Sequence, residues 1–161
     1  SKTLYIAGDT TIVARGDMSM SGKSEIYIDP NATVNIYIEG SLDIGGNGIM
    51  NMSYKPEQLM VFGTDTTEGN ELVKIHGNGY LAAAVYAPNA NIEMKGGGNA
   101  GRVYGSVVGY DAKLTGNSHF SYDEALAAFN LGEGGYEIEE WAELAGSDLS
   151  ILALDMSKYG L

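Results

Sequence analysis

Apolar and polar residues alternate along most of the first 122 positions of the chain. Apolar and polar side chains alternate at every position over residues 34–39 and again over residues 92–95. A period of two predicts short β-strands with one buried face. Gly, Asn, Asp or Pro separate the runs, and no helical period lies between them. This arrangement disfavours βαβ units and a Rossmann-type sheet.

The alternating runs recur at an offset of 22 residues. The offset aligns Leu4 and Ile6 with Ile26 and Ile28. It further aligns Ile12 and Ala14 with Val34 and Ile36, and it aligns Met20 with Leu42. In the second half of the chain it aligns the set Leu81, Ala83 and Val85 with the set Val103, Gly105 and Val107. It also aligns Ala90 with Ala112 and Ile92 with Leu114. Three short strands per repeat predict an all-β fold, a right-handed parallel β-helix over residues 1–122. A β-sandwich or meander shares the alternation, and the constant offset favours the β-helix over both.

Glycine is abundant, at 23 of 161 residues, and a coil explains the excess. A coil turns a corner every seven or eight residues, and corners often need the positive φ that glycine adopts readily. The expected corner glycines are Gly8, Gly16, Gly22, Gly40, Gly63, Gly96, Gly109 and Gly116. The offset is weakest over residues 45–78, where longer loops are expected.

The alternation ends near residue 122, and a capping segment is expected to follow. Ser121 and Glu124 have capping-box spacing, which predicts a short helix over residues 125–129 with Ser121 as its N-cap. We expect residues 123–161 to form a C-terminal helix and a capping or bracing segment of the same domain, because an open coil end exposes unpaired backbone groups. The residues expected to cover that end or bind a partner are Leu126, Phe129, Ile138 and Trp141.

Charge and cysteine content narrow the function classes. The formal net charge is −12, and the only arginines are Arg15 and Arg102. This balance argues against nucleic acid and against an anionic membrane surface as partners. The absence of cysteine removes disulfides, thiolate metal ligands and a cysteine nucleophile, and it suits an oxidising compartment. No apolar run reaches the length of a membrane span, so we expect a soluble domain whose membrane anchor, if it has one, lies upstream of Ser1.

Carboxylates are the most numerous candidates for chemistry. Those at outward strand positions are Glu25, Asp29, Glu39, Asp43, Glu93 and Asp111. An offset of 22 stacks Asp17 on Glu39 and Asn89 on Asp111, which creates either a cation-binding ladder or, as we favour, a solvated face. The chain lacks an acidic calcium-loop motif. We therefore predict no metal site and no cofactor.

The other catalytic patterns are equally weak. His76 and His119 have no visible carboxylate partners at ligand spacing, so surface or turn positions are expected. The chain has no G-x-S-x-G elbow, and residues 96–101 lack the Lys-Ser/Thr pair of a phosphate loop. Basic residues are too scarce for the cluster that a polysaccharide lyase needs. We predict no catalytic residue and a non-enzymatic protein.

Tyrosine is the remaining candidate for recognition, with 11 residues in the chain. Those on or beside predicted strands are Tyr27, Tyr37, Tyr86, Tyr104 and Tyr110. A row of exposed aromatic rings can stack on sugars or on a protein partner. Packing of the rings against one another is the favoured alternative.

Four segments resemble a known bacterial domain. They are YAPNANI at residues 86–92, GSVVG at 105–109, KLTGNSHFSYDEAL at 113–126 and YEIEEW at 136–141. Over about residues 79–144, the chain is similar to the uncharacterised β-helical domain at the C-terminus of PilX-type pilus-assembly proteins and related exported proteins. The resemblance implies an extracytoplasmic location, in the periplasm, at the cell surface or on a pilus, and it supplies no catalytic residue.

The expected function is therefore that of a structural or binding domain in an exported, pilus-associated or cell-surface protein. Its expected partners are other pilus or surface proteins, with glycans as a further class. Two alternatives stay open: a bactofilin-like scaffold that forms polymers, and a β-helix that binds or cleaves carbohydrate. The sequence leaves the oligomeric state open.

Overall fold

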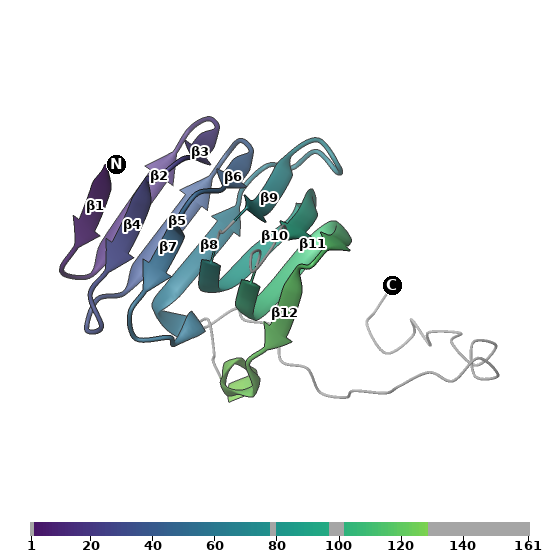
Figure 1. Cartoon of the computed structure of the whole chain (residues 1–161). Helices are drawn as coiled ribbons and strands as arrows, with labels where there is room; N and C mark the ends of the chain where they lie inside the picture. Colours follow the sequence, from purple (N-terminus) through teal and green to yellow (C-terminus); the bar gives the residue numbers. More distant parts are fainter. Residues whose placement is uncertain (1, 78–79, 97–101, 129–161) are drawn as a thin grey trace, which may run out of the picture. The chain divides into compact units, whose positions relative to one another are not determined.

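The computed structural model describes residues 2–77, 80–96 and 102–128, and it shows a parallel β-solenoid (Figure 1). Every strand pair is parallel, and successive coils stack on one another for about five turns. The two helical segments of the described residues are short 3-10 turns. The predicted parallel β-helix is confirmed.

The first three coils each contribute one strand to each of three faces. The first face contains β1 (Thr3–Ile6), β4 (Glu25–Ile28) and β7 (Gly48–Asn51). The second face contains β2 (Thr10–Ala14), β5 (Val34–Ile38) and β8 (Leu59–Gly63). The third face contains β3 (Met18–Met20), β6 (Leu42–Ile44) and β9 (Leu72–Gly77). The 3-10 helix η1 (Pro56–Gln58) lies between β7 and β8.

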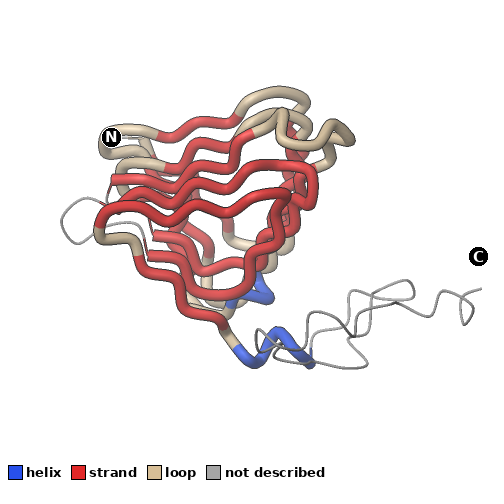
Figure 2. Tube along the Cα trace, turned by 90° about the vertical axis from the view of Figure 1, so that its right-hand side faces the viewer, coloured by secondary structure: helices blue, strands red, loops and turns tan. Residues whose placement is uncertain are grey.

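The last coils continue the second and third faces with longer strands. Both β10 (Tyr80–Gly96) and β11 (Arg102–Gly116) run along one face, bend, and run along the next, as the stacked tracks of Figure 2 show. The first part of β10 pairs with β8, and its second part pairs with β9. Finally β12 (His119–Tyr122) pairs with the start of β11, and the 3-10 helix η2 (Glu124–Ala128) follows.

The core is a column of apolar side chains inside the coils. The largest fully buried residues are Ile28, Ile36, Leu42, Ile44, Ile49, Leu59, Ile75, Leu81, Ile92, Val34, Val61 and Val85. Those outside residues 45–78 follow the predicted alternation, whereas Ile49, Leu59, Val61 and Ile75 lie where the sequence predicted longer loops. Burial of such a side chain contributes about 1.5–3 kcal/mol, so this column provides the main driving force for folding.

The constant offset of 22 is only partly correct. It holds between β1 and β4 and in the first part of β10 and β11. Ile12, however, pairs with Ile36, and Met20 pairs with Ile44, at an offset of 24. The cause is the corner at residues 29–33, which is two residues longer than the corner at 7–9.

A second slip of two residues follows the bend of β10. Ala112 pairs with Ile92 rather than with Ala90, and Leu114 pairs with Met94. The corner of β10 contains three residues between its paired segments, and the corner of β11 contains one. A slip of two keeps each side chain on its own face, so the inward set was predicted correctly although the partners were not.

The corner glycines serve two different purposes. Gly22 and Gly116 adopt positive φ, at 65° and 68°, as predicted. Gly40, Gly63 and Gly109 instead provide space, because a Cβ atom there would lie within 2.7 Å of the neighbouring coil. Close approach of the coils therefore accounts for three of the predicted glycines and backbone conformation for two, whereas Gly8 and Gly16 show neither feature.

The predicted N-cap at Ser121 is wrong, because Ser121 lies inside β12. Asp123 takes this role: its Oδ1 accepts a hydrogen bond from the backbone N–H of Ala125 at 3.0 Å. The helix that follows is a five-residue 3-10 turn and not an α-helix. Leu126 is half-buried in this turn. The other residues expected in the capping segment, Phe129, Ile138 and Trp141, lie outside the described residues.

Inward-facing side chains are exposed at both ends of the solenoid. Leu4 in the first coil is 51% exposed, and Leu114 in the last full coil is 52% exposed. Phe120 on β12 is 38% exposed although its partner Val103 is fully buried. In the part of the chain that the structure describes, no further strand stacks on either end.

Candidate functional site

The outward aromatic side chains form two stacked pairs on neighbouring coils. The ring centroids of Tyr5 and Tyr27 lie 5.1 Å apart at an interplanar angle of 20°. Those of Tyr37 and Phe62 lie 5.0 Å apart at 16°. Stacked rings cover each other's faces, and a sugar ring needs such a face for stacking. These pairs therefore hold adjacent coils together, which supports the packing alternative for Tyr27 and Tyr37.

The five tyrosines singled out in the sequence do not form one row. Tyr27 lies on the first face, whereas Tyr37 and Tyr86 lie in one row of the second face, on either side of Phe62. Tyr104 lies in the first part of β11, whereas Tyr110 is the single residue at the bend of that strand. Of the five, Tyr104 lines a hollow of ligand size.

That hollow, which we call the end groove, lies beside the last coil. Its lining residues are Tyr54, Tyr104, Ser121, Tyr122, Asp123 and Glu124. The groove is open to solvent and has a volume of about 670 Å³. Its residues come from three segments: the corner before η1, strand β11, and β12 with the start of η2. Tyr104 and Ser121 are direct partners in the β11–β12 pair.

Tyr54 reaches the groove from a conformation that tyrosine rarely adopts. Its φ is +57°, and it is the only non-glycine residue in the described ranges with positive φ. The backbone N–H of Tyr54 donates to the carbonyl oxygen of Asn51 at 3.1 Å. The N–H and hydroxyl of Ser53 donate to Asn51 Oδ1 at 3.2 and 2.7 Å. This turn offsets the cost of the left-handed conformation and fixes the backbone from which the ring projects.

The side-chain amide of Asn51 completes this support. Asn51 is 1% exposed, and its Nδ2 donates to the carbonyl oxygens of Lys55 at 2.7 Å and Ala82 at 3.3 Å. All of the hydrogen-bonding capacity of this buried amide is therefore used. The end groove rests on a corner that is fixed by the core.

Both charged residues in the described lining of the end groove are acidic. Asp123 Oδ1 already accepts the N–H of Ala125, whereas Glu124 is exposed. Lys, Arg and His are absent from the six lining residues. The groove thus combines aromatic faces with a negative potential.

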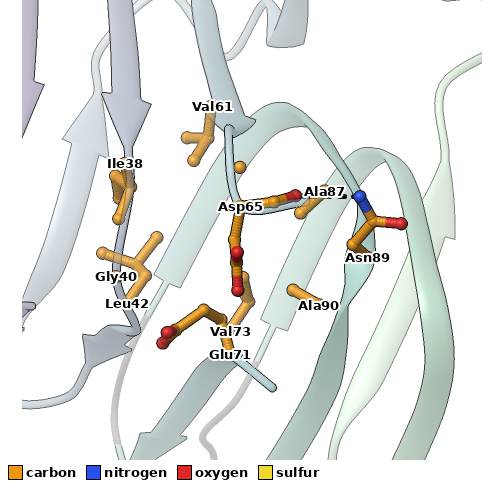
Figure 3. Close-up of a pocket in the computed structure, with 11 residues that line it drawn as sticks. Ile38, Gly40, Leu42, Val61, Asp65, Glu71, Val73, Ala87, Asn89 and Ala90 are labelled. Carbon is orange, nitrogen blue, oxygen red and sulfur yellow. Dashed lines mark hydrogen bonds between the residues drawn. The ribbon is translucent and has the colours of Figure 1, made fainter. Parts of the chain in front are cut away.

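A second hollow lies at the corner between the second and third faces (Figure 3). Its volume is about 10 Å³, which is enough for about one water molecule and too small for an organic ligand. Glu71 at its rim accepts a hydrogen bond from the Ser41 hydroxyl at 2.7 Å. Asn89 donates to the carbonyl oxygen of Asp65 at 2.8 Å, as the dashed line in Figure 3 shows. These polar groups anchor the loop over residues 64–71 and leave no ligand site there.

The carboxylates expected to stack do not do so. Asp17 Oδ1 accepts the backbone N–H of Ser41 at 2.9 Å, so Asp17 does not lie on Glu39, which is exposed. Asp111 pairs with Asn91 rather than with Asn89. Among the described residues, no group of three or more His, Asp or Glu side chains is placed to hold a metal ion.

Glu25 and Asp29 are hydrogen-bonded across coils, and Asp43 and Glu93 lie in a row of alternating charges. Glu25 Oε1 accepts the hydroxyl of Thr3 at 2.8 Å, and Asp29 Oδ2 accepts that of Tyr5 at 2.9 Å. On the third face, acids and bases alternate from coil to coil in the order Asp43, Lys74, Glu93, Lys113. Such a ladder of opposite charges favours the observed register and disfavours a cation site.

His76 has a partner that the sequence did not reveal. Its Nε2 lies 2.6 Å from Asp43 Oδ1, across 33 residues of sequence. The expectation that His76 lacks a carboxylate partner was therefore wrong. Both side chains are more than one-third exposed, so the pair contributes little to stability. His119 is exposed on β12, as expected for a surface histidine.

Sequence reasoning missed most of the end groove. Tyr54 falls in the region of weakest repeat, and Tyr122 marked only the end of the alternation. From the sequence, the segment with Ser121, Tyr122, Asp123 and Glu124 indicated only the start of a helix cap. Their combination of an aromatic ring with two carboxylates was the available signal.

No helix in the described ranges is both long and apolar enough to span a membrane.

Comparison with known proteins gives a family and no named relative. A search of curated proteins finds no match, and a search of solved structures finds none. One family model matches residues 5–129, which cover almost the whole solenoid. The chain therefore belongs to the family described as Domain of unknown function (DUF7305).

Proposed function

We propose that this domain is a non-enzymatic scaffold that binds a partner through the end groove. One observation carries the proposal: three tyrosines and two carboxylates from separate segments line an open hollow of about 670 Å³. Concave sites with aromatic walls and a few polar groups are typical of ligand binding. The corner hollow, by contrast, has room for about one water molecule.

The rest of the described surface supports a scaffold role. Polar side chains link one coil to the next: Thr33 Oγ1 donates to Asp9 at 2.6 Å, and Asn91 Nδ2 donates to the carbonyl oxygen of Gly69 at 2.9 Å. The stacked aromatic pairs do the same. Groups used in this way hold the coils in register, and a rigid coil presents the groove with little cost of ordering on binding.

The first experiment combines binding with a test for catalysis. The full chain is screened on an array of glycans and surface-protein peptides, and the same glycans are assayed for released reducing ends. The groove variant is Tyr54→Ser/Tyr104→Ser/Tyr122→Ser. The control is Tyr86→Ser/Tyr110→Ser, which removes exposed rings outside the groove.

We expect binding that the groove variant loses and the control keeps, without release of reducing ends. Binding that is equal in both variants would overturn the groove as the binding site. Release of reducing ends by the wild type would overturn the non-enzymatic role and favour the carbohydrate-active alternative.

The proposal includes an exported, pilus-associated or cell-surface setting. Its support is the resemblance carried by residues 86–92, 105–109 and 113–126, together with the lack of cysteine. An antibody against the domain should label intact cells of the source organism that make the full-length protein. Labelling only after permeabilisation would contradict an exposed location.

The coil ends, on which no further strand of the described residues stacks, favour a second candidate, a scaffold that forms polymers. Leu4 and Leu114 lie at opposite ends, and a second copy stacked on either one would bury it. Sedimentation and electron microscopy over a range of concentrations decide between the candidates. Filaments that Leu4→Lys abolishes would support the polymer, whereas a monomer at every concentration would support the binding scaffold.

A further inference from the structure

We propose that the end groove recognises a cationic side chain, the lysine or arginine of a peptide partner. The inference rests on the proposed function, because it names a ligand class for the same groove. Its basis is the pairing of exposed aromatic side chains with carboxylates among the described lining residues, which include no base.

The aromatic part of the lining suits a cation. Tyr54, Tyr104 and Tyr122 are 63%, 37% and 56% exposed, so part of each side chain faces solvent. The face of an aromatic ring carries negative charge density and attracts ammonium and guanidinium groups. At exposed sites each such contact changes affinity by about two- to fivefold.

The charged part of the lining selects the sign of the ligand. Asp123 and Glu124 repel phosphate and carboxylate ligands and attract ammonium and guanidinium groups. The chain carries a formal net charge of −12, which raises the concentration of cations near its surface. A neutral sugar would use the ring faces but would gain little from this charge.

The test uses the full chain and fluorescent peptides of defined charge. The probe is an eight-residue peptide that alternates lysine with glycine. The same peptide with acetylated lysines keeps the length and loses the charge. A neutral oligosaccharide serves as the third probe, and fluorescence anisotropy at low salt reports binding.

Matched variants separate the groove from general attraction to an acidic surface. Tyr122→Leu and Glu124→Gln alter the groove. Tyr110→Leu and Glu39→Gln make the same chemical changes at exposed positions outside it. Thermal melts confirm folding, and because Glu124 is exposed in a short turn, Glu124→Gln decides the outcome if Tyr122→Leu unfolds.

We expect each groove variant to weaken binding of the lysine peptide by about two- to fivefold, each control by less than twofold, and acetylation to weaken it at least about tenfold. Equal losses in groove and control variants would overturn the inference, as would equal binding of the acetylated peptide. Groove-dependent binding of the oligosaccharide alone would overturn the inference and keep the proposed function. Groove variants that change binding of no probe would overturn both.

Discussion

The side-chain amide of Asn51 donates a hydrogen bond to the backbone carbonyl oxygen of Ala82, 31 residues later, at 3.3 Å. The bond marks the point where the first face of the solenoid ends, because β7 is the last strand of that sheet. Asn51 thus links β7 to β10, two strands that do not pair with each other through their backbones. The same residue holds the turn that carries Tyr54, so it links the core to the end groove.

Replacement of Asn51 should therefore destabilise the fold strongly. Asn51→Ala leaves the carbonyl oxygens of Lys55 and Ala82 without this donor, in a site that is 1% exposed. We expect a loss of about 2–4 kcal/mol in the free energy of unfolding, measured by urea denaturation. The exposed Asn47 gives the control, and Asn47→Ala should change the free energy by less than about 0.5 kcal/mol. Equal effects of the two substitutions would contradict this role.

Gly105 lies at an inward position of β11 where no side chain fits. Its φ is +130°, and a Cβ atom there would lie 2.0 Å from the carbonyl oxygen of Ala83. Gly105→Ala should cost more than about 3 kcal/mol or prevent folding. Gly16→Ala is the control, because Gly16 has open space and no positive φ. Circular dichroism melts compare the two, and a stable Gly105→Ala protein would show that the β10–β11 register is wrong.

The stacked pair of Tyr37 and Phe62 should couple energetically. A double-mutant cycle with Tyr37→Leu and Phe62→Leu isolates the interaction between the two rings. Aromatic pairs of this geometry contribute about 0.5–1.5 kcal/mol beyond their buried area. The corresponding cycle of Tyr37 with the distant Tyr110 should be additive. Additivity in both cycles would show that stacking does not hold the coils together.

Stability should fall in acid because three corner carboxylates are hydrogen-bonded. The side-chain hydroxyl and backbone N–H of Thr33 lower the pKa of Asp9 below its ordinary value of 3.8. The N–H of Asn31 and then the hydroxyl of Tyr5 lower the pKa of Asp29, and the N–H of Thr67 lowers that of Asp65. These carboxylates bind protons less readily in the folded state than in the unfolded state. Their contribution is therefore present above about pH 4 and is lost as the pH falls through the folded values.

Thermal melts between pH 6 and pH 3 measure this dependence. We expect the melting temperature to decline below about pH 4. Thr33→Val removes the hydroxyl that donates to Asp9 without a change in net charge, so the decline should be shallower in this variant. A melting temperature that is constant or rises in acid would contradict the assigned hydrogen bonds.

The sequence predicted the architecture because the solenoid repeats a local pattern. The alternation of apolar residues indicated the inward set, and the offset of 22 indicated stacked coils. The partners of Ile12 and Ile92 were missed because corner length changes from coil to coil while a slip of two leaves the faces unchanged. Periodicity in this fold therefore specifies which side chains are buried better than it specifies their neighbours.

Most residues of the candidate site could not be predicted from the sequence to lie together. Tyr54 lies 50 residues from Tyr104 in the chain, and only the stacking of coils brings them to one groove. The contact of His76 with Asp43 could not be predicted for the same reason. The long loop before β9 shifts the offset between β6 and β9 to 31 residues. Sites assembled across coils need the actual register, which composition and motifs do not contain.

The central claim is a parallel solenoid whose register assembles the end groove, and cysteine crosslinking tests it most directly. The natural chain has no cysteine, so a double variant contains only the introduced pair. Tyr104 and Ser121 are direct partners in the structure. Adjacent strands lie about 4.8 Å apart, within the range that a disulfide spans. Tyr104→Cys/His119→Cys shifts one partner by two residues along the strand, to about 8 Å, beyond that range.

Mild oxidation followed by mass spectrometry without reductant reports the crosslink. The account predicts a disulfide in Tyr104→Cys/Ser121→Cys and little or none in Tyr104→Cys/His119→Cys. A disulfide that forms only in the shifted pair, or equally in both, would contradict the register and with it the groove.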